Sequence, residues 1–191
     1  MAKTESTFKN MVLSLTLISL GASACLGFVY VMTKEPIAKS VLNKKLDAIR
    51  QVVPEFNNNP FEEMFRLPAD KGDSLDIYPA KKDGKIIAYA VNTYSKIGFS
   101  GNISLIAGFK PDGTIINISV LEQKETPGLG AKMTESSFKD QFNDKNPSQF
   151  MVKVRKDGGQ VDAITAATIS SRAFCDAIQR AYNTIQKGGL K

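Results

Sequence analysis

Hydroxyl-bearing and small side chains crowd together near the C-terminal end of the chain, between Val161 and Ser171. A helical pattern follows this segment directly. The first N–H groups of a helix have no partner within the helix, and the helix dipole favours negative charge at that end. Main-chain donors could therefore hold a phosphate group here, with Arg172 close by. On residue types alone, an ordinary serine- and threonine-rich helix start remains the favoured explanation.

The order of residues in this segment points to a more specific chemistry. Asp162-x-x-Thr165-Ala166-Ala167-Thr168 resembles the motif Asp-x-x-Ser/Thr-Gly-Ala-Thr of the FMN-binding domain family. In that family a flavin transferase joins the phosphate of FMN to the hydroxyl of the final threonine. The resemblance implies a covalent FMN on Thr168, with Asp162, Thr165, Ala167 and Ser170 as further candidate site residues. Asp162 would serve recognition by the transferase or orient the loop. Ala166 stands where glycine is usual, and its methyl group disfavours a positive φ.

Two further segments resemble the same family. Glu125-Thr126-Pro127-Gly128-Leu129-Gly130 is similar to its Glu-Thr-Pro-Gly-Leu-Gly loop, and Pro-Gly suits the middle of a type II turn. The resemblance implies that Glu125, Thr126, Gly128 and Leu129 contact the flavin ring, whereas taken alone the segment is a tight turn after a strand. Gly98-Phe99-Ser100-Gly101-Asn102-Ile103 resembles the family's Gly-Tyr-Gly-Gly-Pro-Ile segment, with Ser100 and Asn102 departing from it.

Within the family, Ser170-Ser171-Arg172-Ala173 favours the G subunits of Rnf-type complexes. That resemblance implies an electron-transfer subunit of a complex that couples ferredoxin:NAD electron transfer to ion translocation. Other membrane subunits of the Rnf complex would be its partners, and this chain alone would catalyse no complete reaction. An NqrC-like subunit of sodium-translocating NADH:quinone reductase is the alternative. A non-redox, membrane-anchored binding module is the alternative of another class, and Thr168 would then only start a helix.

The composition excludes several other chemistries. The 191 residues include no histidine and two cysteines, Cys25 and Cys175, which lie far apart. Histidine-based triads and zinc sites are therefore absent, as are a CxxC pair and a set of iron–sulfur ligands. The net charge of +6 is scattered rather than clustered, so we expect no nucleic-acid partner. A chain this poor in catalytic side chains binds something or takes its chemistry from a cofactor.

An uncharged segment at residues 11–33 is long enough to cross a membrane as a helix. A cleaved signal peptide is the alternative, since Ala22-Ser23-Ala24 resembles a cleavage site, but the apolar run continues beyond it. A lipoprotein acylated at Cys25 fits less well. Lysines on both sides leave the orientation open. The family resemblance implies a single-pass protein of the inner membrane, in contact with lipid, with its flavin domain on the periplasmic or outer face.

The remaining sequence predicts an α+β fold, an antiparallel sheet with flanking helices. We divide the chain into a tail (1–10), the anchor (11–33), a juxtamembrane helix and connector (34–73) and the FMN-binding domain (74–191). The helix should bury Ile37, Val41, Ile49, Val52 and Val53 and end at Pro54. Alternating patterns predict strands at 74–79, 85–94, 103–109, 114–121 and 151–156, with a hairpin turn at 110–113. The last helix should start at a Ser170 or Ser171 cap and end at Gly188-Gly189.

Overall fold

The computed structural model describes residues 7–69 and 72–189. The chain divides into two compact units, Met1–Asn43 and Lys44–Lys191. The second unit holds a five-stranded sheet and the C-terminal helix, so the predicted α+β class with an antiparallel sheet is confirmed. The division into four segments drawn from the sequence stays a prediction.

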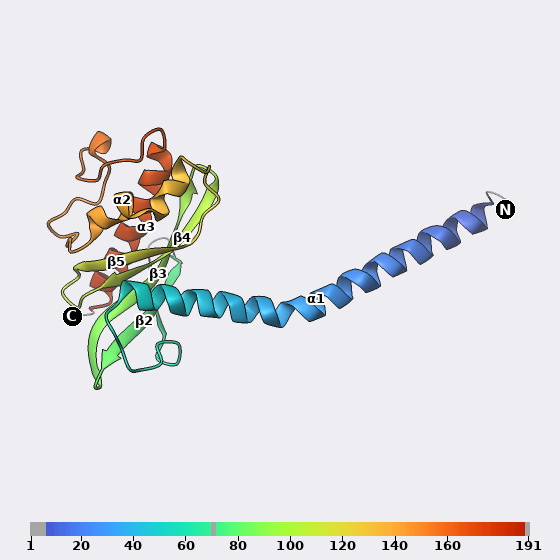
Figure 1. Ribbon diagram of the computed structural model, residues 1–191, viewed down its shortest axis with the longest axis horizontal. Helices are drawn as coiled ribbons and strands as arrows, with labels where there is room; N and C mark the ends of the chain where they lie inside the picture. The colour runs from blue at the N-terminus through green and yellow to red at the C-terminus, as the bar shows by residue number, and fades with distance from the viewer. Residues whose placement is uncertain (1–6, 70–71, 190–191) are drawn as a thin grey trace. The chain divides into compact units, whose positions relative to one another are not determined.

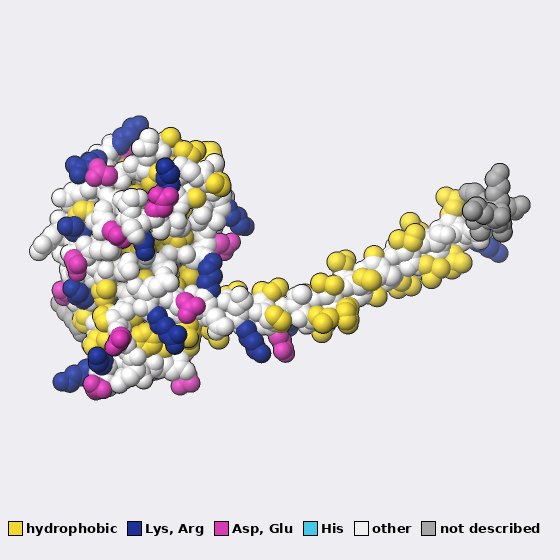
Figure 2. Space-filling model, viewed as in Figure 1, with side chains coloured by type: hydrophobic (Ala, Val, Ile, Leu, Met, Phe, Trp, Pro, Cys, Tyr) yellow, Lys and Arg dark blue, Asp and Glu magenta, His cyan; other side chains and the backbone are white. Residues whose placement is uncertain are grey.

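Helix α1 (Phe8–Val52) contains the predicted apolar segment. It is long and apolar enough to cross a membrane, with a mean hydropathy of 2.0 over its most apolar window. Hydrophobic side chains cover its first part (Figure 2). The helix runs through Pro36 without a break and ends before Pro54. Ile37 and Val41 are exposed, so the prediction that they are buried is wrong, because only the last turns of α1 pack on the sheet.

The sheet is an antiparallel meander in the order β1-β2-β3-β4-β5. Its strands are β1 (Phe65–Pro68), β2 (Ser74–Lys82), β3 (Lys85–Gly98), β4 (Gly101–Phe109) and β5 (Ile115–Glu122). Asp83 and Gly84 join β2 to β3, both with positive φ, as a type I′ hairpin turn requires. The predicted hairpin at 110–113 is confirmed, and the Gly113 N–H donates to the Lys110 carbonyl oxygen at 2.9 Å.

Helices cover both faces of the sheet (Figure 1). On one face, Ile49 and Val52 of α1 pack against Ala90 and Ile106. A Cβ at Gly108 would lie 1.8 Å from the Val52 carbonyl oxygen, so glycine there lets α1 lie directly on β4. The larger core lies on the opposite face, under helix α3 (Thr168–Lys187), and includes aromatic rings from the segment between β5 and α3.

Short helices fill the segment between β5 and α3: η2 (Gly130–Thr134), α2 (Ser136–Lys139), η3 (Asp140–Phe142) and η4 (Arg155–Asp157). The predicted strand at 151–156 is wrong. Val152 and Val154 are buried as the alternation implied, but against the α3 core rather than in the sheet. Only an isolated bridge joins Val154 to Val161.

In β5 a bulge at Ile116 turns that side chain to the α1 face, away from Ile118.

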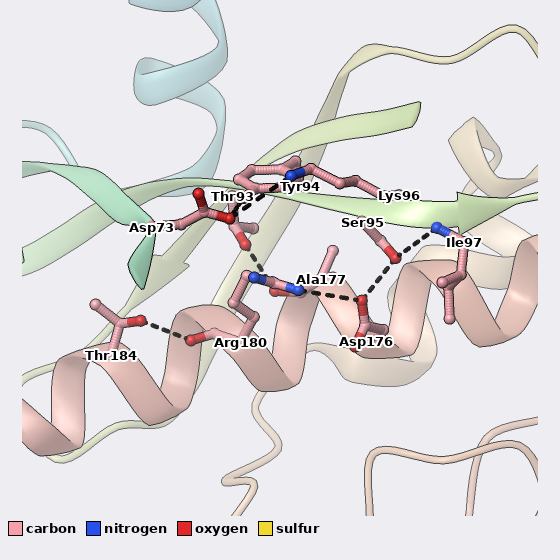
Figure 3. Close-up of polar contacts among 10 residues, drawn as sticks. All are labelled: Asp73, Thr93, Tyr94, Ser95, Lys96, Ile97, Asp176, Ala177, Arg180 and Thr184. Atoms are coloured by element: carbon pink, nitrogen blue, oxygen red, sulfur yellow. Dashed lines mark hydrogen bonds and ion pairs between the residues drawn. The ribbon is translucent and has the colours of Figure 1, made fainter. Parts of the chain in front are cut away.

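Hydrogen bonds, in addition to apolar packing, hold α3 against β3 (Figure 3). The Thr93 hydroxyl donates to the Ala177 carbonyl oxygen at 2.9 Å, inside the core. The Ser95 hydroxyl donates to Asp176 at 2.6 Å. Both strand residues are buried, so leaving their hydroxyls unpaired would cost free energy. These contacts hold the middle of α3 against β3.

A second group of side chains lies beside these hydrogen bonds between β3 and α3. The Tyr94 hydroxyl donates to Asp73, and this hydrogen bond raises the pKa of Tyr94 and lowers the pKa of Asp73. The Arg180 guanidinium lies over the Tyr94 ring at 5.0 Å from its centre, a cation–π contact (Figure 3). The Arg180 contact ties β3 to the middle of α3, and the Asp73 hydrogen bond ties β3 to the residue before β2.

Candidate functional site

Three segments that are distant in sequence line one pocket of about 280 Å³. They are the β3–β4 turn, the loop after β5, and the turn before α3 together with the first residues of that helix. The lining residues are Phe99, Glu125, Thr126, Leu129, Gly130, Ala166, Ala167, Thr168, Ile169 and Ser170. The structure thus brings the two clearest sequence motifs together, and the weaker Gly98–Ile103 segment joins them through Phe99.

The α3 end of the pocket begins with a tight turn. The Ala167 N–H donates to the Ile164 carbonyl oxygen at 2.9 Å, and Ala166 between them has a φ of +61°. This left-handed conformation suits glycine, which explains why a glycine is usual at that position of the motif. The Ser171 hydroxyl accepts from the Ile164 N–H at 2.9 Å and donates to the Ala167 carbonyl oxygen at 3.0 Å, which holds the turn against the helix.

Helix α3 starts at Thr168, and no side chain caps it. The prediction of a cap at Ser170 or Ser171 is therefore wrong, because both serines lie within the first turn and point into the protein. The N–H groups of Thr168, Ile169 and Ser170 find no acceptor in the part of the chain that the structure describes. The partly buried Thr168 hydroxyl likewise has no hydrogen-bond partner among the residues described. Free donors and a free hydroxyl thus meet at one helix N-terminus, which suits an anion.

The loop after β5 forms another wall. The Leu129 N–H donates to the Thr126 carbonyl oxygen at 3.1 Å, which closes a turn across Pro127 and Gly128. Gly128 has a φ of +76°, as the third residue of a type II turn requires. Thr126 and Leu129 line the pocket and Gly128 lies in the turn between them; their contacts with a flavin ring stay predictions. The turn predicted from Pro-Gly is therefore present.

Among the residues that the structure describes, Glu125 is the one carboxylate that lines this pocket. Its side chain is buried, and both oxygens are engaged within the protein: Oε1 accepts from the Ser100 N–H at 3.1 Å and Oε2 from the Ser170 hydroxyl at 2.8 Å. The carboxylate therefore joins all three segments that form the pocket. Its predicted contact with a flavin ring stays a prediction.

Two other candidates lie outside the pocket. Asp162 and Thr165 line a neighbouring depression of about 290 Å³, together with Lys132, Ser137 and Gln141. The Asp162 carboxylate is exposed and pairs with Arg155 at 2.5 Å. The reversal of the chain at Ala166 separates these two side chains from Thr168. Their assignment as site residues stays a prediction.

Arg172 is not a neighbour of the pocket. Its guanidinium binds both oxygens of Asp157 at 2.7 Å and lines a separate depression. This pairing lowers the pKa of Asp157 and raises that of Arg172. The expectation that Arg172 lies close to a bound phosphate is therefore wrong. Cys175 lines the same depression, and burial raises the pKa of its thiol to about 12, which fits a small apolar core residue.

An exposed apolar rim surrounds the pocket. It consists of Phe99, Leu129 and Ile169, which line the pocket and have exposed fractions from 40% to 68%. Figure 2 shows hydrophobic side chains gathered at this end of the domain, where the β3–β4 turn and the start of α3 lie in Figure 1. Sequence reasoning missed Phe99 and Ile169 as site residues. Phe99 lies in the Gly98–Ile103 segment, and Ile169 directly follows Thr168. Their positions in or next to a motif could have marked both as site residues.

Comparison with known proteins identifies the family. Residues 98–183 match the FMN-binding domain. The chain is 38% identical over 176 residues to the G subunit of the ion-translocating oxidoreductase complex of Haemophilus influenzae, covering 86% of this chain and 80% of that protein. It is 32% identical over 185 residues to the G subunit of the same complex in Vibrio cholerae, covering 92% and 88%. The chain belongs to the family of ion-translocating oxidoreductase complex G subunits.

This membership confirms the family predicted from the sequence, and FMN is the cofactor that the domain match indicates. Among solved structures, this G-subunit chain resembles the C subunit of the Na⁺-translocating NADH-quinone reductase from Parabacteroides distasonis. That similarity has a TM-score of 0.46 and 25% identity, and it covers 59% of each chain.

The pocket of this G-subunit chain has a chemistry that fits FMN. The free N–H groups and hydroxyl at the start of α3 suit a phosphate, and the apolar rim suits a flat aromatic ring. The pocket volume of about 280 Å³ is just below the range of about 300–1,000 Å³ for whole small-molecule sites. It therefore has room for part of an FMN molecule, and the rest would lie against the exposed rim.

Proposed function

We propose that this chain is a membrane-anchored electron-transfer subunit of an Rnf-type complex, carrying FMN as a phosphoester on Thr168. One observation carries the proposal: the Thr168 hydroxyl and three free N–H groups meet in a pocket with an apolar rim. Such a complex would couple ferredoxin:NAD electron transfer to ion translocation, and the relatives are subunits of ion-translocating oxidoreductases. The chain itself would catalyse no complete reaction.

Attachment of the cofactor requires one substitution at phosphorus. The Thr168 hydroxyl would lose its proton and its oxygen would bond to the phosphorus of an activated flavin donor, a flavin dinucleotide. The phosphoanhydride bond of the donor would break, and a nucleoside monophosphate would leave. The N–H groups at the start of α3 would hold the phosphate oxygens as charge is redistributed on them.

The described residues that line the pocket offer Thr168 no free base. Among the described residues that line the pocket, Glu125 is the only carboxylate, and both of its oxygens accept hydrogen bonds from the protein. We therefore propose that a flavin transferase supplies the base and recognises the exposed Asp162 and Thr165 beside the pocket. Recognition on a surface separate from the attachment pocket would leave Thr168 open to the donor.

Bound FMN supplies the redox chemistry, since an isoalloxazine accepts and donates electrons. The chain's own residues bind and orient it: Thr168 tethers it, the helix start holds its phosphate, and Phe99, Leu129 and Ile169 exclude water from the ring. Covalent attachment prevents loss of the cofactor outside the cytoplasm. The apolar part of α1 would lie in the lipid of the inner membrane and keep the flavin near the neighbouring subunits, with the domain on the periplasmic face.

Denaturing gel electrophoresis of protein made together with the flavin transferase tests the proposal. We expect a fluorescent band from the wild type and from Thr134→Val, which removes an exposed threonine hydroxyl outside the pocket. Thr168→Val should give a dark band. A dark wild-type band despite an active transferase would contradict the proposal and favour a non-redox binding module.

The alternative within redox chemistry is a subunit like that of the sodium-translocating NADH:quinone reductase. Purification of the assembled complex and identification of its subunits by mass spectrometry separates the two. Subunits of an Rnf-type complex are expected. Co-purification with subunits of the quinone reductase would overturn this assignment.

A further inference from the structure

A buried carboxylate stands at the back of the proposed attachment pocket. The Glu125 side chain is 5% exposed, and none of the ion pairs among the described residues includes it. A charge in such a place is costly unless hydrogen bonds compensate it. Its two partners are the Ser100 N–H in the β3–β4 turn and the Ser170 hydroxyl in the first turn of α3.

The packing around this carboxylate admits no further atoms. A Cβ at Gly130 would lie 2.5 Å from the Ser170 hydroxyl oxygen and 2.7 Å from Glu125 Oε2. A Cβ at Gly98 would lie 2.8 Å from Glu125 Oε1 and closer still to the Gly101 carbonyl oxygen. Neither glycine has a positive φ, so close packing, and not backbone conformation, explains their lack of a side chain. Two glycines thus make room for the contacts of one carboxylate.

We propose that Glu125 is a positioning residue for flavin attachment: it holds the first turn of α3 and the β3–β4 turn so that the Thr168 hydroxyl faces the open pocket. Ser170 lies two residues beyond Thr168 in the same helical turn, so fixing its hydroxyl fixes the direction of that turn. The Ser100 contact fixes the opposite wall beside Phe99. This inference rests on the proposed attachment at Thr168 and gives Glu125 a role other than contact with the ring.

Two substitutions at Glu125 separate positioning from bulk stability. Glu125→Ala removes both hydrogen bonds. Glu125→Gln keeps them, because its carbonyl can accept from the Ser100 N–H, and its amide can donate to the Ser170 hydroxyl, which can turn to accept. Thr93→Val serves as the matched control, since it removes one buried hydrogen bond to α3 far from the pocket.

The experiment uses the full-length chain made together with the transferase and purified in detergent, and intact-mass spectrometry measures the modified fraction. We expect several-fold less attachment in Glu125→Ala, and attachment within about twofold of the wild type in Glu125→Gln, since its two hydrogen bonds persist. Thr93→Val should lower the melting temperature without lowering attachment. Equal attachment in Glu125→Ala and wild type would overturn the proposal, as would equal losses in Glu125→Ala and Thr93→Val.

A second readout does not depend on flavin. In protein made without the transferase, Glu125→Ala should speed amide hydrogen exchange at Ser100 by about tenfold or more, as loss of a hydrogen bond to a charged group implies. Unchanged exchange would overturn the proposed clamp. In a double-mutant cycle, Ser170→Ala should add nothing to the attachment defect of Glu125→Ala, and full additivity would also contradict it. If the wild type carries no flavin, the attachment at Thr168 fails, and the exchange result alone decides whether Glu125 holds the two turns.

Discussion

Replacing Ala166 with glycine should stabilise the protein, because Ala166 holds a backbone φ of +61° in the turn before α3. The carbonyl of Ile164 and the N–H of Ala167 close this turn, and Ser171 ties it to the helix, so the residue cannot relax to a negative φ alone. Its methyl group is exposed, so removing the methyl group loses little apolar contact.

The expected magnitude is a difference between two opposing effects. A left-handed conformation costs an alanine roughly 1–2 kcal/mol, and glycine adopts it freely. Glycine also gives the unfolded chain more freedom, which costs about 0.4–1 kcal/mol. The net gain in the free energy of unfolding then lies between about 0 and 1.6 kcal/mol, with a central value of about 0.8 kcal/mol. For a chain of this length the central value corresponds to a rise of roughly 1–4 °C in melting temperature.

Thermal and denaturant unfolding of the full-length protein in detergent, made without the transferase, measures this gain. Ala163→Gly is the matched control, because Ala163 is exposed in the same segment and has no positive φ. At Ala163, glycine only gives the unfolded chain more freedom and relieves no strain, so the control should be less stable than the wild type. If Ala166→Gly lowers the melting temperature as the control does, the backbone of Ala166 carries no strain and the reasoning is refuted.

Three further predictions concern the surroundings of the pocket. Gly130→Ala should lower the free energy of unfolding by about 1–3 kcal/mol in denaturant titrations, because its Cβ meets the Ser170 hydroxyl oxygen at 2.5 Å; an unchanged midpoint would contradict this. Asp157→Asn should lower the melting temperature at pH 7, and the gap to wild type should close as the pH falls below about 4. The sign follows from the lowered pKa of Asp157 beside Arg172: the stability it gives is present above the unfolded pKa and is lost as the pH falls through the folded pKa. A gap that widens in acid would contradict it. The Cys175 thiol, with its pKa raised to about 12, should react with a maleimide at pH 8 only after unfolding, whereas the exposed Cys25 can react in the native protein; rapid labelling of Cys175 itself in the native protein, located by peptide mapping, would contradict its burial.

Local signals in the sequence predicted the antiparallel sheet, its hairpin at 110–113 and both motifs, but not strand β1. The Lys-Asp-Gly and Pro-Asp-Gly turns fix two hairpins of the sheet. The positive φ expected at a motif glycine also occurs, although alanine occupies the position. These features depend on residues close together in the chain, which is why they can be predicted from one sequence.

Features that depend on distant contacts could not be predicted. Glu125 meets Ser170 across 45 positions, and only the folded chain shows that the carboxylate joins two walls rather than standing free in the pocket. The Arg172 side chain lies away from the pocket because it donates hydrogen bonds to both carboxylate oxygens of Asp157. The valines of the 151–156 segment alternate as in a strand, but a loop folded onto the α3 core buries them. Each of these was decided by tertiary packing rather than by local pattern.

The mass of the intact chain tests the central claim most directly. The wild type made together with the flavin transferase should be heavier than the unmodified chain by one FMN less one water, and peptide sequencing should locate the addition on Thr168. Thr168→Val made in the same way should keep its unmodified mass. An unmodified wild type in the presence of active transferase, or a flavin that remains attached in Thr168→Val, would contradict the account.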